Sequence, residues 1–129
     1  MRQRGFTVLE LIVAIVVLVL AGTVFFIQKR DLEVAKLDSE RKLDLNSIYY
    51  NLEDVYYAQN KAYPLNLTAD GLKGIDPEAL KDPNGKVVGE EGSNYRYEAK
   101  DCTDGKCKSY TLTGDLEHEG DYVKESRNR

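Results

Sequence analysis

The feature that most constrains this chain is an apolar run at residues 6–27, in which only Thr7, Glu10 and Thr23 carry polar side chains. With ~1.5 Å of rise per residue, this run would span roughly 33 Å as an α-helix, about the thickness of a bilayer's hydrocarbon core. The sequence therefore predicts a membrane-spanning helix near the N-terminus, followed by one small globular part.

Glu10 is the unexpected residue of this run. An ionised carboxylate inside lipid costs on the order of 2.5 kcal/mol or more on insertion scales. The run offers no partner, because the nearest basic groups, Arg2 and Arg4, precede it at the membrane face. A plain membrane anchor has no reason to carry this acid, so we expect Glu10 to have a partner of opposite charge.

Three interpretations of the N-terminus compete. A secretory signal peptide would explain the basic start and the small residue Ala21, but the run is long and Glu10 interrupts it early. A simple single-pass anchor fits the length and leaves Glu10 unexplained. The third interpretation rests on a resemblance to a known family.

The sequence RGFTVLELIVA at residues 4–14 resembles the leader and mature start of type IV pilin and pseudopilin precursors. In that family a short basic leader ends in glycine, and a prepilin peptidase cuts after it and N-methylates the new first residue. The fifth mature residue is Glu. The resemblance implies a leader peptide at residues 1–5, cleavage between Gly5 and Phe6, N-methylation of Phe6 and an assembly role for Glu10.

The resemblance also implies a partner for Glu10, namely the N-terminal amine of a neighbouring subunit in a helical filament. A carboxylate within an apolar bundle is unfavourable alone and strongly favours a partner of opposite charge. Only one axial offset between neighbouring subunits brings the two charges together. We therefore expect the pair to fix the register of the subunits in the filament. Cleavage would also remove Arg2 and Arg4, which lowers the formal net charge by two from −4.

After residue 27 the composition becomes polar, but the helical period continues on one face. No Pro or Gly occurs between Thr23 and Tyr63, and Pro64 biases the residue before it out of the helical region. We therefore predict that the helix continues through residues 28–60. Its apolar face comprises Val34, Leu37, Leu45, Ile48, Leu52 and Val55, with the stem of Arg41 filling the remaining position. We expect the other sides of the helix to be polar, with Glu53 among their residues and with Asp38 attracting Lys42 four residues later.

Several hydrophobic side chains have two interpretations. Leu32 and Leu43 fall outside the apolar face, where scattered leucines are normal and contact with a neighbouring subunit is the alternative. The pairs Tyr49-Tyr50 and Tyr56-Tyr57 recur after two helical turns. Packing against the predicted sheet or a neighbouring subunit explains these tyrosines most simply.

A loop and then a sheet follow the helix. Residues 61–92 contain all three prolines and include a turn at residues 82–85, a helical turn beginning at Pro77 and a short strand at residues 86–88. Residues 93–123 alternate apolar and polar side chains, which predicts an antiparallel sheet with an edge strand at residues 121–123. Residues 124–129 form a polar tail that need not be ordered.

The two cysteines, Cys102 and Cys107, flank an Asp-Gly pair typical of a hairpin turn. In an exported domain this pair predicts a disulfide, whereas in a cytosolic domain it would more often be reduced or metal-bound. The closed loop is short, so we expect about 2 kcal/mol of stabilisation.

The predicted fold is α+β, with a long N-terminal helix and a small antiparallel sheet packed on its C-terminal half. This order resembles the pilin fold. Four short motifs further resemble landmarks of major pseudopilins: Tyr63-Pro64, Gly71-Leu72, the Asp-Pro-Asn-Gly sequence at 82–85, and Tyr95-Arg96-Tyr97.

No catalytic set stands out, so we expect no enzyme activity and no cofactor. His118, the single histidine, has no neighbouring nucleophile. Some major pseudopilins hold calcium where Asp101, Asp104 and Gly105 lie, but this spacing matches no defined calcium loop, and we expect no metal. The net charge of −4 makes nucleic acid an unlikely direct ligand.

These features predict a structural subunit of a type IV pilus-like filament that assembles through residues 6–27. The alternative within the family is a pseudopilin of a type II secretion or competence system. The alternative from another class is a membrane-tethered binding module. The implied partners are further copies of the chain in a helical homopolymer, the prepilin peptidase, an assembly platform and motor, and membrane lipid before assembly.

The expected precursor crosses the cytoplasmic membrane once, with its N-terminus inside and residues 28–129 outside. The mature subunit is expected in an extracellular or periplasmic filament. Local charge does not decide this orientation, because Lys29 and Arg30 balance Arg2 and Arg4 across the apolar run. The orientation rests on the family resemblance and on the expected disulfide.

Overall fold

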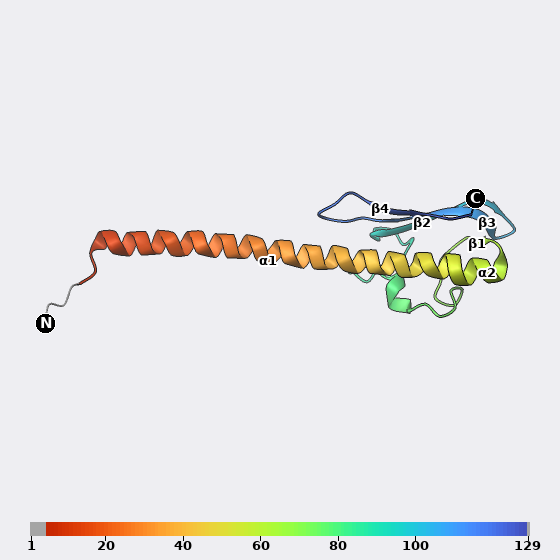
Figure 1. Ribbon diagram of the computed structural model, residues 1–129, viewed down its shortest axis with the longest axis horizontal. Coiled ribbons are helices and arrows are strands. Elements are labelled where there is room, and N and C mark those ends of the chain that lie inside the picture. The colour runs from red at the N-terminus through yellow and green to blue at the C-terminus, as the bar shows by residue number, and fades with distance from the viewer. Residues whose placement is uncertain (1–4, 129) are drawn as a thin grey trace. The chain divides into compact units, whose positions relative to one another are not determined.

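The computed structural model describes residues 5–128 and divides the chain into two compact units, Met1–Val34 and Ala35–Arg129. The helical run comprises α1 (Val8–Tyr50), the π-helical turn η1 (Asn51–Tyr56) and α2 (Tyr57–Asn60) (Figure 1). It ends at Asn60, as the sequence predicts. Lys61 takes a left-handed conformation with φ of 54° and its N–H donates to the Tyr57 carbonyl, which closes the last turn.

In the first unit, α1 begins with a side-chain cap. The Thr7 hydroxyl accepts a hydrogen bond of 3.3 Å from the Glu10 N–H, and the Thr7 carbonyl accepts one from the Leu11 N–H. Thr is a favoured N-cap residue, and an acid in the first turn complements the helix dipole. The run contains a stretch long and apolar enough to cross a membrane, and the side chains of that stretch are exposed.

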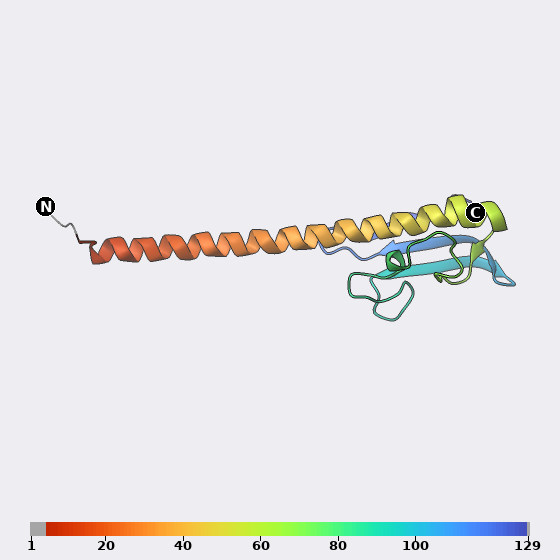
Figure 2. The ribbon, with the colours of Figure 1, turned by 90° about the horizontal axis from the view of Figure 1, so that it is seen from below.

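In the second unit, a four-stranded antiparallel sheet lies beside the yellow-to-green part of the helical run (Figures 1 and 2). The central strand β3 (Lys106–Gly114) pairs with β2 (Tyr95–Thr103) along its length. The short strand β1 (Tyr63–Pro64) pairs with the beginning of β3, and β4 (Tyr122–Glu125) pairs with its end. This arrangement confirms the predicted α+β fold class.

The hairpin between β2 and β3 turns at Asp104 and Gly105, which both have positive φ, as a type I′ turn requires. Cys102 and Cys107 face each other across the hairpin and are joined by a disulfide. The disulfide lies near the turn and closes the end of the hairpin, as the sequence predicts.

The core lies between the helical run and the sheet. The helix contributes Leu45, Ile48 and Leu52, which are fully buried and follow the predicted apolar face. Gly114 on β3 allows a close approach to the helix, because a Cβ atom there would collide with the Leu45 side chain. The core also contains Tyr63, Leu67, Leu72, Leu80, Val88, Tyr95, Cys107, Tyr110 and Leu112.

The π turn Asn51–Tyr56 is not predicted by the sequence. A π turn accommodates one more residue than an α turn and so shifts the phase of the side chains that follow. Here the π turn buries Asn51, Leu52 and Glu53 together. The prediction assumed an uninterrupted α-helix, in which Glu53 would lie among the exposed polar residues. The predicted polar side of the helix is therefore wrong at this position.

The segment predicted as a loop contains more structure than expected. Pro77–Leu80 forms a 3₁₀ turn, with the Asp76 carboxylate accepting a hydrogen bond from the Glu78 N–H, which confirms the predicted helical turn. The predicted strand at residues 86–88 is reduced to an isolated bridge between Lys81 and Val87. The remainder of this segment supplies Leu67, Leu72 and Leu80 to the core.

The sheet extends beyond its predicted end. β4 continues to Glu125, so the first two residues of the predicted polar tail pair with β3. The residues that follow are also held: Ser126 is buried, and the Arg127 guanidinium donates to Asp54 at 2.9 Å. A polar composition suggested a free tail, but these side chains find partners on the helix and on β3.

Candidate functional site

The N-terminal signal lies ahead of the helix. Gly5 and Phe6 have no regular secondary structure and are exposed, with the Phe6 side chain 83% accessible. The peptide bond between them is therefore free of helical hydrogen bonding. Arg2 and Arg4 of the expected leader lie outside the described residues.

Glu10 lies in the first turn of α1, among exposed apolar side chains such as Leu9 and Ile12. Within residues 5–128, no basic group lies within ion-pair distance of its carboxylate. The Thr7 cap fixes the backbone of this turn and so fixes the position from which the Glu10 side chain projects. The structure thus presents a carboxylate on an apolar, exposed helix.

In the second unit, Ala35–Arg129, which we call the head, Glu53 joins three segments of the chain. Its Oε2 accepts a hydrogen bond from the Tyr63 hydroxyl, and its Oε1 accepts from the Tyr110 hydroxyl, both at 2.9 Å. The Arg127 N–H also donates to Oε1 at 3.1 Å. Burial and the nearby Glu53 carboxylate raise the pKa of Tyr110, so its hydroxyl stays a donor. Glu53 therefore ties the helix to β1, β3 and the C-terminal residues.

A second buried centre holds the loop between β3 and β4. The Asp38 carboxylate accepts from the N–H groups of Glu117 and His118, each at 3.0 Å, and from the Arg41 guanidinium. Arg41 also donates to the Glu117 carboxylate at 3.1 Å. Burial acts to raise the pKa of Asp38, but these donors outweigh it and hold the pKa below its ordinary value. Arg41 is thus an ionic anchor and not only an apolar stem.

The pseudopilin-like landmarks have identifiable structural roles. Asp82 accepts backbone N–H groups from Asn84 and Lys86 on Oδ1 and from Asn94 on Oδ2, which folds the loop into one unit. The Tyr95 hydroxyl donates to Asp44 on the helix at 2.8 Å. The Tyr97 hydroxyl donates to the Pro64 carbonyl at 2.7 Å. The motifs therefore connect the helix, the loop and β2.

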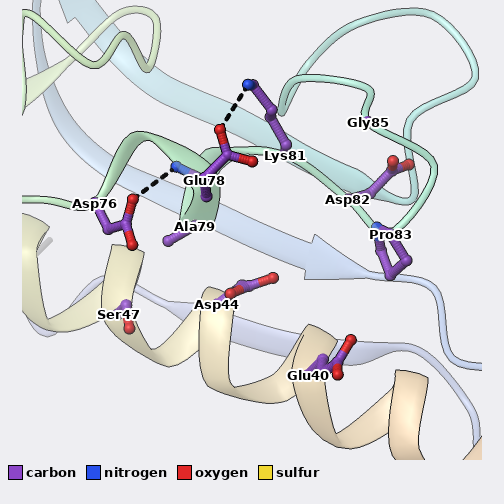
Figure 3. A pocket seen from close by; sticks show the side chains of 10 residues that line it. All are labelled: Glu40, Asp44, Ser47, Asp76, Glu78, Ala79, Lys81, Asp82, Pro83 and Gly85. Atoms are coloured by element: carbon purple, nitrogen blue, oxygen red, sulfur yellow. Dashed lines mark hydrogen bonds and ion pairs between the residues drawn. The ribbon is translucent and has the colours of Figure 1, made fainter.

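An acidic groove of about 510 Å³ lies between the helix and the 3₁₀ turn (Figure 3). Lys81 is the basic residue that lines it, and it pairs with Glu78 at 2.8 Å. Burial raises the pKa of Asp44 within the groove, although the Tyr95 hydrogen bond acts in the opposite direction. We call this surface the acidic groove; its carboxylates are Glu40, Asp44, Asp76, Glu78 and Asp82.

Cations and tyrosine rings alternate on another surface of the head, formed by α1, β4 and the C-terminal residues. The Lys124 ammonium lies 5.4 Å from the Tyr122 ring centre and 5.2 Å from that of Tyr49. Lys42 lies 5.9 Å from the Tyr122 ring centre. We call this surface the cation–tyrosine ladder; its order is Lys42, Tyr122, Lys124, Tyr49, Arg127 and Tyr50.

The remaining candidate residues have structural surroundings. His118 is exposed on the loop between β3 and β4, and its N–H is bound by Asp38. Asp101 and Asp104 occupy left-handed positions near the hairpin end. Among residues 5–128, no cluster of His, Cys, Asp and Glu side chains has an arrangement suited to a metal ion. Cys107 is buried, whereas its partner Cys102 is exposed.

Comparison with known families bears on the N-terminal signal. Residues 1–26 match a family model described as the prokaryotic N-terminal methylation motif. No curated protein and no solved structure matches the chain. The matched motif is the class III signal of type IV pilins and pseudopilins.

The signal, the apolar helix and the α+β fold are together similar to those of type IV pilin and pseudopilin precursors. More particularly, the class III signal and the apolar N-terminal helix fit a membrane-anchored precursor of a structural protein.

Proposed function

We propose that this chain is a structural subunit of a type IV pilus-like helical filament. The observation that carries the proposal is the class III signal at residues 1–26, joined to an apolar helix whose side chains are exposed. Exposed apolar side chains favour either lipid or other apolar helices. The precursor would therefore reside in the membrane, and the mature subunit would exchange lipid for neighbouring copies.

Processing is the first step of the proposed function. A prepilin peptidase would cut between Gly5 and Phe6 and methylate the Phe6 amine. The exposure of these two residues and the absence of helical structure there support this site, because their peptide bond is accessible ahead of the helix. Cleavage creates an amino group one helical turn before Glu10.

Assembly would follow through Glu10 and residues 6–27. The Glu10 carboxylate of one subunit would pair with the Phe6 amine of a neighbour, which offsets the desolvation of both charges in an apolar bundle. This contact joins two different parts of the subunit, so it does not close and instead extends a fibre. An assembly platform and motor in the membrane would supply the subunits in order.

The head would lie outside the cytoplasmic membrane, with the leader inside. The disulfide between Cys102 and Cys107 supports this orientation, since disulfides persist in oxidising compartments. The filament would then be extracellular or periplasmic.

A pseudopilin of a type II secretion or competence system is the second candidate. The contacts of Asp82, Tyr95 and Tyr97 favour it, because they give the pseudopilin-like landmarks a common role in fixing the loop to the helix and sheet. Imaging surface filaments in producing cells and in a deletion strain would separate a long pilus from a short periplasmic assembly.

Replacement of Glu10 by Ala tests the assembly step. We expect the variant to be processed at Gly5 like the wild type but to be missing from the sheared filament fraction. Leu9→Ala is the matched control, because it shortens a neighbouring side chain that is also exposed without removing a charge. Normal filaments from the Glu10 variant would refute the pairing.

A further inference from the structure

The cation–tyrosine ladder and the acidic groove lie on opposite flanks of the same helix. With 3.6 residues per turn, the core residues Leu45 and Ile48 point toward the sheet. Glu40 and Asp44 then lie to one side of that direction, and Lys42 and Tyr49 lie to the other. Figure 1 agrees, because β4 and the green 3₁₀ turn at Pro77–Leu80 lie on different sides of α1.

The two surfaces carry opposite charge. The groove is lined by five acidic residues, Glu40, Asp44, Asp76, Glu78 and Asp82, with Lys81 as its basic residue. Asp82 is buried and its carboxylate is held by backbone N–H groups of its own loop, so the other four acids supply the charge of the groove. The ladder presents two ammonium groups and one guanidinium against tyrosine rings. Rings hold such cations in place without neutralising them, so the ladder remains attractive to carboxylates.

Part of the ladder's charge is already paired within the head. Lys42 contacts Glu119 and Arg127 contacts Asp54, and the two acid side chains are 61% and 58% exposed. Within the described residues, Lys124 contacts the two rings and forms no ion pair. Lys124 is therefore the cation of the ladder that is best placed to meet an acid from another molecule.

The chain's own charge argues for the kind of partner. A formal net charge of −4, which becomes more negative when the leader is removed, disfavours a long anionic polymer along the head. A second copy of this chain carries a local acidic groove of the required sign. In a filament, neighbouring copies are held at high effective concentration, so even a weak contact is populated.

We propose that the cation–tyrosine ladder of one head binds the acidic groove of a second copy of this chain. The inference rests on the proposed filament function and adds a head-to-head contact to it. The contact joins two different surfaces, so it repeats along an assembly without closing. Complementary charge would fix the orientation of neighbouring heads more than it raises their affinity.

Charge reversal provides the first test. Lys124→Glu and Glu40→Lys should each lower the yield of sheared filaments several-fold after washing in moderate salt, because each variant brings like charges together. The double variant restores opposite charges and should recover most of the yield. Lys108→Glu reverses an exposed cation of β3 outside both surfaces and should leave the yield unchanged. No recovery in the double variant would contradict the contact.

Cross-linking of filaments provides the second test. A full-length chain with Lys124→Cys and Glu78→Cys should give a series of covalent multimers when treated with a short bis-maleimide. Each single variant can form only dimers and serves as its control.

Failure of the wild type to form filaments would overturn the proposed function as well. Filaments of the double cysteine variant that give no multimers would overturn this contact alone. If that variant does not assemble, the charge-reversal series decides.

Discussion

The hydroxyl of Tyr110 donates a hydrogen bond of 2.9 Å to the carboxylate of Glu53, and both side chains are buried between the helical run and β3. The same carboxylate binds Tyr63 and the N–H of Arg127. A buried carboxylate is tolerated only when donors replace its lost water. This centre therefore couples the π turn, the sheet and the C-terminal residues.

Replacement of Glu53 by Gln should lower the stability of the head by about 1–3 kcal/mol. The amide keeps the shape of the side chain but turns one acceptor into a donor that faces Tyr63 or Tyr110, which leaves buried polar groups unsatisfied. Denaturant unfolding of the full-length protein in detergent would measure the change. The neighbouring substitution Asp54→Asn removes an exposed ion pair and should change stability by less than about 1 kcal/mol. Equal effects of the two substitutions would contradict the role of Glu53.

Acid should weaken the attachment of the loop between β3 and β4. The pKa of Asp38 in the folded protein lies below its ordinary value of 3.8 because two backbone N–H groups and Arg41 outweigh the effect of burial. The ionised carboxylate therefore stabilises the fold above that ordinary value, and the contribution is lost as pH falls through the lowered pKa.

Asp38→Asn should consequently reduce stability at neutral pH and make stability less sensitive to acid below about pH 4. Unfolding midpoints measured from neutral to acidic pH would show both effects. Glu40→Gln, which changes an exposed acid on the same helix, is the control. An Asp38 variant with the acid dependence of the wild type would exclude this carboxylate as a source of it.

Substitution of Gly114 by Ala should destabilise the head, because the added methyl group would collide with the Leu45 side chain in a closely packed core. Overpacking of this kind typically costs about 1–3 kcal/mol. Gly120→Ala is the matched control, since its Cβ would meet nothing within 4 Å. Thermal unfolding of the two variants compares them directly, and an unchanged midpoint for Gly114→Ala would show that Leu45 can move aside.

Removal of the disulfide should lower stability by about 2 kcal/mol, because the bond closes only a short loop. The double variant Cys102→Ser with Cys107→Ala keeps a polar group at the exposed position and a small apolar one at the buried position. Its unfolding midpoint should be insensitive to reductant, whereas that of the wild type should fall on reduction. A wild-type unfolding midpoint that does not change on reduction would contradict a stabilising role of the disulfide.

Local sequence patterns predicted the larger elements of this fold. The apolar period through Leu45, Ile48 and Leu52 predicted the helix, and the Asp-Gly pair between the cysteines predicted the hairpin. Both patterns depend only on residues that are close together in the sequence. The class III signal is likewise a short, ordered motif, and residues 1–26 match the family model for it.

The features that were not predicted depend on contacts between distant residues. Glu53 was assigned to a polar face because the π turn that buries it leaves no clear local signal. Arg127 and Ser126 were placed in a tail because their partners lie on the helix and on β3. Asp38 was paired with Lys42 by helical spacing, but the structure pairs it with Arg41 and the loop at Glu117. The ladder combines α1 with β4 and appears only when the fold is assembled.

The mass of the subunit recovered from sheared filaments tests the processing and assembly of this chain most directly. Intact-mass and N-terminal fragment measurements would locate its first residue and any added methyl group. We expect a polypeptide that begins at Phe6 and carries a methylated amine, which is the group proposed to meet Glu10 of a neighbouring subunit. A subunit that retains Met1, or one that begins at Gly22, would contradict cleavage at Gly5 and with it the proposed pairing.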